Sequence, residues 1–326
     1  MSLMMRWTDR IGRRLRLRDL HVLMAVAQRG SMAKAARDLA ISQPVVSKTI
    51  TDLEHTLGVR LLDRTAHGVE PTFYGQALLK HGATIFDELK LSVQEIEFLA
   101  DPAAGQLALG SSESISSAIL PPIIHRFLRQ YPRISLDVDA GDTGAMLRRL
   151  RDRSLDLIFA RTGEDLWAGQ FDEDLSIEVL LDDALVVAVG AQNRWARRRK
   201  IQLAELANEQ WILAADGTWN QKVLAEAFRM QGLQPPKISI KTLSVHLRTN
   251  LLATGDFVAV LPRSVLHLHR DRFSLKALPI QLPARSWPVA IATLKNRTLS
   301  PVVARFIQCA CEVARSIAGG PHPRRS

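Results

Sequence analysis

The sequence predicts a multi-domain α/β protein in three parts, and three observations carry this prediction. Short helical patterns and a hairpin pattern occupy residues 17–75, and one long helical pattern with a hinge covers residues 76–104. From residue 105 to 318, strand patterns alternate with helical ones, which implies parallel sheets covered by helices. The 326 residues fit two or three domains, and 47% hydrophobic residues suffice for buried cores. We expect a basic arm over 1–16 and a disordered tail over 319–326.

Three short helices are predicted between residues 17 and 57, because apolar residues recur there every three or four positions. Ser31 and Ser42 are suited to cap the second and third helices, and Pro44 falls in a first turn, where a missing N–H costs nothing. The apolar faces consist of Leu20, Leu23, Met24 and Ala27, then Met32, Ala35, Ala36 and Leu39, then Val46, Ile50, Leu53 and Leu57.

The outward face of the third helix presents groups that suit DNA. A Gln side chain pairs with adenine, a Ser hydroxyl contacts more than one kind of base, and Lys reaches guanine or a phosphate. A helix pair with a solvated polar face would look the same, and these residues alone leave that alternative open. A predicted hairpin over 58–72 with a basic tip looks like the wing that lies beside such a helix on DNA. The predicted DNA-contacting residues are Ser31, Lys34, Ser42, Gln43, Pro44, Ser47, Lys48, Thr51, Arg64 and His67.

Many residues at fixed spacings follow one family pattern. They are Gly30-Ser31, Ala35-Ala36, Leu39, Ser42-Gln43-Pro44, Ser47, Leu53-Glu54, Leu57-Gly58, Leu61-Leu62, Arg64, Thr72 and Gly75. In this run the chain resembles the N-terminal domain of LysR-type transcriptional regulators, which implies a winged helix-turn-helix. Two positions depart from the pattern. Lys48 replaces the usual Arg, so a point charge stands where the family has a planar fork, and Leu62 replaces the usual Phe as a core exchange.

Positive charge is concentrated toward the N-terminus. The formal net charge is +10, and residues 1–68 hold 12 lysines and arginines against 6 acidic residues. Residues 69–100 hold 2 against 5, and the remainder holds 29 against 22. This distribution favours a polyanionic partner for the first segment. Charge alone does not distinguish a DNA-binding surface from a solvated basic surface that has no partner.

The cysteines and the N-terminal residues indicate the cellular compartment in which we expect the protein. Cys309 and Cys311 are spaced i, i+2, which fits neither a redox pair nor a zinc site, so we expect a reducing cytoplasm. Arginines followed by residues 20–27 look superficially like a secretion signal. The run is short, contains His21 and makes a helical face, so we interpret it as a helix. No run is long enough to span a membrane. We predict a cytoplasmic, nucleoid-associated protein.

Residues 72–100 predict one long helix with an apolar seam. The seam residues are Leu78, Ile85, Leu89, Ile96 and Leu99, and Gly82 and Ser92 weaken it. A lone helix of this length is marginal, so we expect it to pair with a second copy. Pairing would make a homodimer, assembling to a homotetramer, and would place two reading helices on two half-sites. Packing within one chain is the alternative. Residues 101–105 predict a hinge.

The remaining sequence predicts two α/β lobes, lobe I over 105–180 and 266–318 and lobe II over 181–265. This resembles the periplasmic-binding-protein-like effector domain of the same family, more loosely than the N-terminal match. Strands are predicted at 106–110, 134–139, 155–160, 185–190, 211–213, 238–241, 257–261 and 287–292. Helices are predicted at 115–131, interrupted by Pro121-Pro122, and at 144–153, 221–231, 245–254 and 301–317.

Ligands of open α/β sheets bind beyond the carboxyl ends of strands, near helix N-termini. By resemblance, several polar residues match loops that line the effector pocket, although each also suits a helix cap. Glu113 and Asp216 would repel a simple anion if they point inward, so sugar-like ligands stay open beside organic acids. The candidate effector-binding residues are Ser112, Ser114, Thr143, Gly217, Thr218 and Ser244.

Enzyme-like patterns are incomplete. Ser112 is flanked by Gly110 and Ser114, so the Gly-x-Ser-x-Gly nucleophile elbow is incomplete. Asp142-Thr143-Gly144 spells the tripeptide of aspartic proteases, which need two such aspartates sharing a proton, and the sequence has no second copy. His267 and His269 are predicted on a strand with imidazoles on opposite sides, which argues against a metal pair. We therefore expect no catalytic residue, no metal and no cofactor. The basic run 194–200 is expected to be a solvated loop, with DNA contact as the alternative.

These patterns together predict a ligand-responsive, sequence-specific DNA-binding transcriptional regulator. A small-molecule effector between the two lobes would alter promoter binding. The expected partners are double-stranded operator DNA, an organic acid or sugar-like effector, further copies of the chain, and RNA polymerase. A solute-binding protein or cleft enzyme with an accessory helix-turn-helix is the alternative, which a secretion signal or a complete catalytic constellation would favour.

Overall fold

The chain divides into two compact units, residues 1–92 and 93–326, which we describe separately. The computed structural model describes residues 14–65, 68–161, 174–214, 218–283 and 288–318. The expected basic arm up to residue 13 and the expected tail 319–326 lie outside the described residues, as do the predicted site residues His67 and Gly217.

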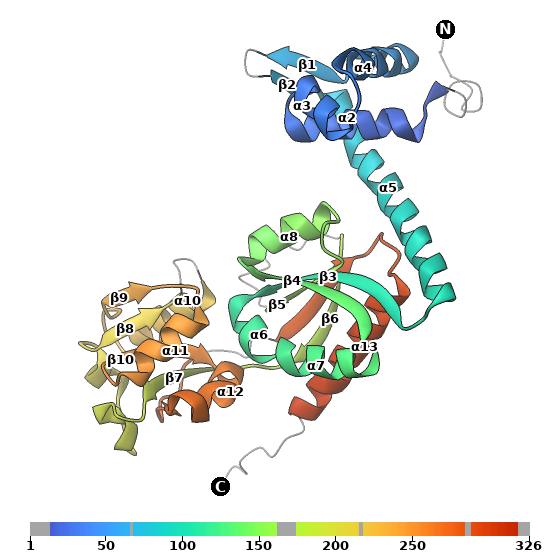
Figure 1. Cartoon of the computed structure of the whole chain (residues 1–326). Coiled ribbons are helices and arrows are strands. Elements are labelled where there is room, and N and C mark those ends of the chain that lie inside the picture. The colour runs from blue at the N-terminus through green and yellow to red at the C-terminus, as the bar shows by residue number, and fades with distance from the viewer. Residues whose placement is uncertain (1–13, 66–67, 162–173, 215–217, 284–287, 319–326) are drawn as a thin grey trace. The chain divides into compact units, whose positions relative to one another are not determined.

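The N-terminal unit is a winged helix-turn-helix, as predicted (Figure 1). Its helices are α2 (Leu17–Arg29), α3 (Met32–Asp38) and α4 (Gln43–Leu57), and its antiparallel hairpin is β1 (Leu62–Thr65) and β2 (Gly68–Pro71). Gly30 and Gly58 end α2 and α4 with a left-handed backbone, as glycine allows. The predicted apolar faces meet in one core that includes Leu20, Leu23, Val26, Ala35, Ala36, Val46, Ile50 and Leu53.

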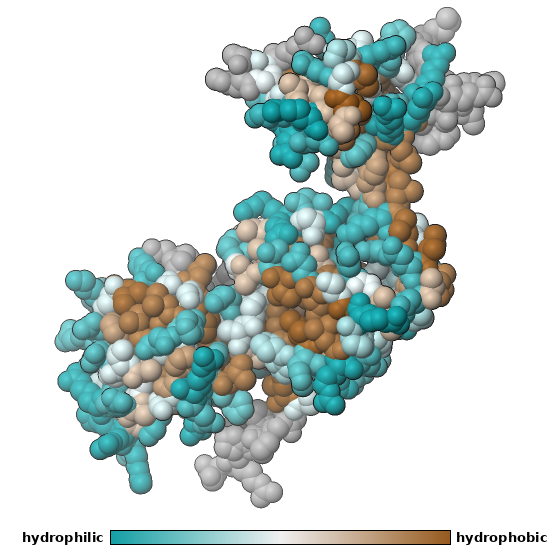
Figure 2. Space-filling model, in the orientation of Figure 1, coloured by the Kyte–Doolittle hydropathy of each residue, from teal (hydrophilic) through white to brown (hydrophobic). Residues whose placement is uncertain are grey.

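Helix α5 (Phe73–Ala100) is the predicted long helix. Its first half packs Leu78, Leu79 and Phe86 against the core of the N-terminal unit. Gly82 faces Leu20, where a Cβ would lie 3.0 Å from Leu20 Cδ1, so its small size brings the two helices close. Hydrophobic surface runs along α5 (Figure 2), and its exposed large side chains include Ile85, Leu89, Val93, Ile96 and Leu99.

The C-terminal unit contains two five-stranded sheets, which form the two lobes. The first sheet has the order β4-β3-β5-β12-β6, with β12 antiparallel to its neighbours. Its strands are β3 (Ala104–Ser112), β4 (Arg133–Gly141), β5 (Leu157–Arg161), β6 (Leu175–Leu181) and β12 (Val289–Leu294). Because β3 begins at Ala104, the hinge after α5 is shorter than the predicted 101–105.

Helices cover both faces of the first sheet (Figure 1). They are α6 (Glu113–Ala118), α7 (Leu120–Gln130), α8 (Thr143–Arg151) and α13 (Pro301–Ala318). Every residue of β5 is buried, with Leu157 and Phe159 packed on the α7 and α13 side and Ile158 and Ala160 on the α8 side. A continuous apolar run is expected for a parallel strand buried on both faces.

The second sheet has the order β11-β7-β10-β8-β9. Its strands are β7 (Leu185–Gly190), β8 (Gln210–Leu213), β9 (Ile238–Lys241), β10 (Phe257–Pro262) and β11 (Leu275–Ala277). Its helices are α10 (Trp219–Met230), α11 (Val245–Ala253) and α12 (Arg263–Phe273), with short 3-10 turns η1 (Arg194–Arg197) and η2 (Leu203–Leu206). One buried cluster joins the α11 and α12 side of this sheet to α6 and α7 of the first lobe.

Two predictions about residues 263–278 are wrong. His267-Leu268-His269 lies in helix α12, not in a strand, because Val265, Leu266, His269 and Phe273 follow a helical spacing. The assignment of lobe I from residue 266 onward is also wrong for this segment. Strand β11 pairs with β7, so residues 266–278 belong to the second lobe, and the chain returns to the first sheet at β12. Strand β6 was not among the predicted elements.

Candidate nucleic-acid interface and candidate effector site

The predicted reading residues lie on the face of α4 opposite its buried stripe. Gln43, Pro44, Lys48 and Thr51 are exposed and Ser47 is half-buried, whereas Val46, Ile50 and Leu53 are buried. The hydroxyl of Thr51 donates to the Ser47 carbonyl at 3.0 Å, which leaves its oxygen to accept. Four outward side chains therefore project from the first two and a half turns of this helix.

The two predicted helix caps behave differently. The hydroxyl of Ser31 accepts from the Lys34 amide at 3.4 Å, so it caps α3. Ser42 occupies the N-cap position of α4, but its side chain makes no capping hydrogen bond within the described part of the chain. The exposed Ser42 hydroxyl thus remains available at the N-terminus of α4, whose Val45 and Val46 amides donate to the Ser42 carbonyl.

Glu54 and Thr72 hold the hairpin against the helices. Glu54 Oε1 accepts from the amides of Leu61 at 2.7 Å and Leu62 at 3.2 Å. The Thr72 hydroxyl donates to the Arg60 carbonyl at 2.8 Å and accepts from the Gly75 amide at 3.0 Å. These bonds give a physical reason for Glu54, Thr72 and Gly75 in the sequence pattern. Arg64 lies in β1 of this hairpin.

The first-lobe candidates meet at the carboxyl edge of their sheet. Ser112 is paired in register with Gly141 on the adjacent parallel strand, so α6 and α8 start from neighbouring strand ends. The hydroxyl oxygens of Ser112 and Ser114 lie 3.5 Å apart. Thr143 is the first residue of α8, whose cap is Asp142, with Oδ1 accepting from the Ala145 amide at 3.0 Å. All three candidate side chains are half-buried.

The second-lobe candidates also begin helices at a carboxyl edge. Thr218 is the N-cap residue of α10, and Ser244 is the N-cap residue of α11. Ser244 Oγ accepts from the Leu247 amide at 3.2 Å, so this hydroxyl performs the capping role that the sequence left open. Helix α6 of the first lobe, which begins directly after Ser112, contacts α11 and α12 of the second lobe.

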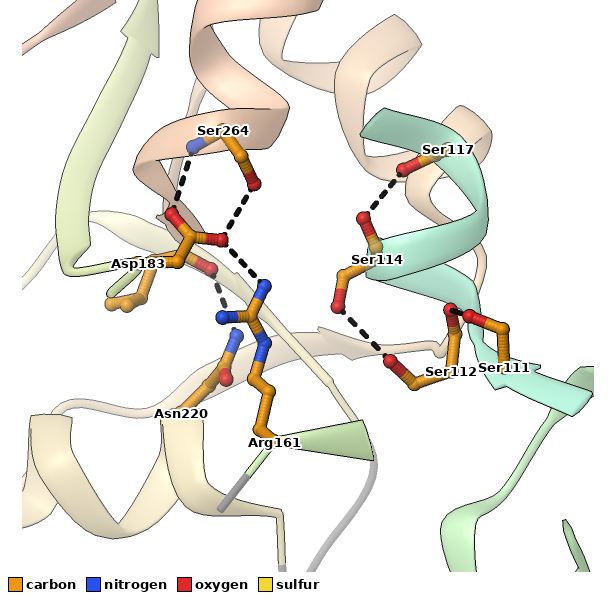
Figure 3. Close-up of polar contacts among 9 residues, drawn as sticks. Ser111, Ser112, Ser114, Ser117, Arg161, Asp183, Asn220 and Ser264 are labelled. Atoms are coloured by element: carbon orange, nitrogen blue, oxygen red, sulfur yellow. Dashed lines mark hydrogen bonds and ion pairs between the residues drawn. The ribbon is translucent and has the colours of Figure 1, made fainter. Parts of the chain in front are cut away.

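A buried ion pair that the sequence reasoning missed connects the lobes (Figure 3). Arg161, at the end of β5, donates through Nη2 to Asp183 Oδ2 at 2.7 Å. Asp183 also accepts from the Ser264 amide at 3.0 Å and the Ser264 hydroxyl at 2.6 Å, at the start of α12. The Arg161 guanidinium lies 5.0 Å from the ring centroid of Trp219. The only sequence signals were one Arg ending an apolar strand and one Asp between two strands.

Arg248 is a second buried cation that the sequence reasoning missed. It lies on the buried face of α11 and is 2% exposed. Burial lowers the pKa of its guanidinium to about 10, and the nearby Glu113 carboxylate acts in the opposite direction. A pKa of about 10 still leaves the group charged at neutral pH. Its sequence signal was an Arg within an apolar helical stripe.

The basic run 194–200 packs against an aromatic side chain and two carboxylates. The guanidinium groups of Arg194 and Arg198 lie 5.1 and 5.3 Å from the ring centroid of the buried Trp195. Arg194 pairs with Glu209 and Arg198 with Glu205. These contacts within the second lobe compensate two of the five cations of the run.

Other chemistry is limited in the described residues. Cys309 and Cys311 are free, and burial raises the pKa of both thiols, which disfavours the reactive thiolate. No group of three or more His, Cys, Asp or Glu side chains there is arranged to hold a metal ion. None of the described helices has the length and hydropathy of a membrane span.

Comparisons with known proteins identify both units. Residues 17–76 match the family model "Bacterial regulatory helix-turn-helix protein, lysR family", and residues 100–315 match "LysR substrate binding domain". Similar characterised proteins include the HTH-type transcriptional regulator GbpR of Azospirillum brasilense, 27% identical over 88% of this chain and 83% of that protein. The transcriptional dual regulator OxyR of Escherichia coli (strain K12) is 26% identical over 91% of this chain and 94% of its own length.

Solved structures show the same fold. Full-length OxyR from Pseudomonas aeruginosa aligns with a TM-score of 0.65 at 22% identity, covering 96% of this chain and 99% of that one. Full-length CbnR in complex with its target DNA aligns with a TM-score of 0.62 at 22% identity, covering 92% and 100%. Together with the two family models, these matches do not favour a solute-binding protein or a cleft enzyme. The chain belongs to the LysR family: it is a LysR-type transcriptional regulator with an N-terminal DNA-binding domain and a C-terminal effector-binding domain.

Proposed function

We propose that the N-terminal turns of α4 enter the major groove of operator DNA, with Gln43, Ser47 and Lys48 facing base edges. The exposed polar face opposite the buried stripe of α4 carries this proposal. The predicted contacts to the DNA backbone or to bases around them are Ser31, Lys34, Ser42, Pro44 and Thr51. Arg64 of the hairpin would flank the groove, and His67, outside the described residues, stays a predicted contact. Backbone contacts position the helix, and base contacts select the sequence.

The long helix supplies the second copy that an operator with two half-sites needs. Ile85 and Leu89 are exposed on α5 at 41% and 43%, and Ile96 and Leu99 at 67% and 74%. A row of large apolar side chains that faces water on one helix is stabilised when a second helix covers it. We infer that two chains pair through α5, that pairs assemble into tetramers, and that RNA polymerase is a further partner at the promoter.

A small-molecule effector would bind between the facing lobe edges and change how the assembled protein presents its reading helices. The hydroxyls of Ser112, Ser114, Thr143 and Thr218 gather at those edges, which supports an effector site there. The coupling requires the effector to bind the two arrangements with different affinity. The fold, the charge at the N-terminus and the facing edges favour this function over catalysis.

Replacing Ser47 and Lys48 together by alanine is expected to reduce the preference for operator over random duplex. Loss of one well-formed base contact removes about 1–3 kcal/mol of discrimination, a ratio of roughly 5- to 150-fold. Fluorescence anisotropy at one fixed salt concentration measures both affinities. The matched control is Lys80→Ala, an exposed lysine on α5, which should keep the ratio. An unchanged ratio in the double variant would exclude this reading face.

Ser114→Val and Thr143→Val are expected to weaken the effector response while DNA binding survives. Thr143→Val removes a hydroxyl from the first-lobe edge at nearly constant volume, and Ser114→Val removes a hydroxyl and adds the volume of one methyl group. A thermal-shift screen of small acids and sugars identifies a responding compound, and titration of each variant with that compound gives its affinity. Thr298→Val, at an exposed loop position, is the control and should respond as wild type. A normal response in both edge variants would place the effector elsewhere.

A further inference from the structure

Helix α11 buries a charge where its spacing predicts an apolar residue. Its inward face consists of Val245, Arg248, Thr249 and Leu252, at intervals of three and four residues. Arg248 is 2% exposed. The helix packs on β7 and β10 of its own lobe and contacts α6 of the first lobe. The guanidinium is therefore withdrawn from water within the contact region between the lobes.

The hydrogen-bonding groups of Arg248 are mostly unused. Nη2 donates to the Leu243 carbonyl at a long 3.4 Å, and Nε and Nη1 have no partner among the described residues. Buried arginine donors are nearly always satisfied, because an unpaired buried charge is costly. Arg297 in the first lobe shows the usual arrangement, with Nη1 donating to the Leu155 carbonyl at 3.0 Å and Nη2 to Asp156 at 2.9 Å.

The opposite charge that acts on Arg248 belongs to the other lobe. Glu113 acts electrostatically on Arg248, yet the described residues contain no ion pair between them within 4.0 Å. Glu113 opens α6 and is half-buried between Ser112 and Ser114, two of the candidate effector residues. Arg248 thus lies close to the proposed effector edge and carries donors that this structure does not use.

We propose that Arg248 anchors a carboxylate group of the effector, so that the effector is a small organic acid and not a neutral sugar. This inference rests on the proposed effector site between the lobes. A carboxylate accepts from Nε or Nη1 in charge-assisted hydrogen bonds and compensates the buried cation. The Glu113 carboxylate competes with such an anion by like-charge repulsion, and its removal strengthens acid binding.

The test uses full-length protein and a panel of aliphatic, hydroxy and aromatic monocarboxylates, each beside its uncharged amide, together with sugars. Thermal shift finds the responding acid, and calorimetric titration gives its Kd. We expect acids to raise the Tm and amides and sugars to leave it unchanged. Arg248→Met should weaken the Kd at least about tenfold, Arg248→Lys should weaken it less, and Glu113→Gln should tighten it.

A ligand-free measurement separates an anchoring role from a structural one. Arg248→Met keeps an unbranched, flexible side chain in place of the arginine stem and removes an uncompensated buried charge, so the ligand-free Tm should stay equal or rise. A clear fall in that Tm would assign Arg248 to fold stability and overturn the proposal. Acid affinity that is unchanged in Arg248→Met, equal responses to an acid and its amide, or no response to any acid would also overturn it.

The panel also distinguishes this inference from the proposed function. If a sugar binds and Ser114→Val abolishes its binding while Arg248→Met does not, the effector site stands and the acid anchor is wrong. If an acid binds and depends on Arg248 but neither Ser114→Val nor Thr143→Val affects it, the anchor stands and the proposed lining of the site is wrong.

Discussion

Asp183→Ala is expected to lower the unfolding free energy of the C-terminal unit by about 3–5 kcal/mol. The substitution leaves Arg161 buried beside Trp219 without its carboxylate partner, and the side chains of the wild-type pair are only 4% and 2% exposed. It also removes both acceptors of Ser264 at the start of α12. For a unit of this size the loss corresponds to a fall in Tm of roughly 6–20 °C.

Calorimetry of the full-length protein measures this effect. Glu312→Gln is the matched control, because Glu312 pairs with Arg126 at a site where the two side chains are 37% and 51% exposed. An exposed pair contributes at most about 1 kcal/mol. The double exchange Arg161→Met with Asp183→Leu should recover the part of the loss that comes from the unpaired cation, since it buries no charge. Equal losses for Asp183→Ala and Glu312→Gln would contradict the assigned role of this ion pair.

Gly75→Ala is expected to destabilise the N-terminal unit and to abolish DNA binding. A Cβ at position 75 would lie 2.0 Å from the Leu61 carbonyl oxygen, which accepts from the Thr72 amide at 2.9 Å. Alanine gains about 1 kcal/mol of helix propensity over glycine, whereas overpacking costs about 1–3 kcal/mol or more. We expect the cost of the steric clash to exceed the gain in helix propensity, because a hydrogen-bonded backbone carbonyl cannot move aside as a flexible side chain does.

Operator affinity and thermal unfolding of the full-length protein test this prediction. Gln76→Ala is the neighbouring control in the same helix, where the side chain is exposed and the exchange should leave both quantities unchanged. If Gly75→Ala instead raises the stability and keeps operator affinity, helix propensity dominates at this position, and the close contact with Leu61 does not constrain the hairpin.

The N-terminal unit was the most predictable part of the molecule. Ser31, Pro44 and the apolar residues of α4 act within one or two helical turns, so their spacing alone indicates where helices begin and which face is buried. The hairpin followed from the same kind of local pattern. Glu54 and Thr72 were visible only as pattern residues, because their partners at residues 60–62 become apparent when the chain folds back.

In the C-terminal unit, the elements that follow from local sequence patterns differ clearly from those that depend on pairing with distant residues. Most strands and helices were predicted close to their observed bounds, since the β5 run and the α13 pattern are continuous along the chain. The short segment 266–278 was misassigned in both structure and lobe, because a three-residue strand such as β11 gains its identity from pairing with β7.

The linear order of residues was thus sufficient for the three-part architecture, the exposed polar face of α4 and the apolar seam of α5, because each depends on periodicity within one element. The pairing of Arg161 with Asp183 and the placement of Arg248 near Glu113 required the folded chain. Both join residues that are far apart in sequence, across two lobes. Folding removes these charges from water, and no local sequence pattern predicts that burial.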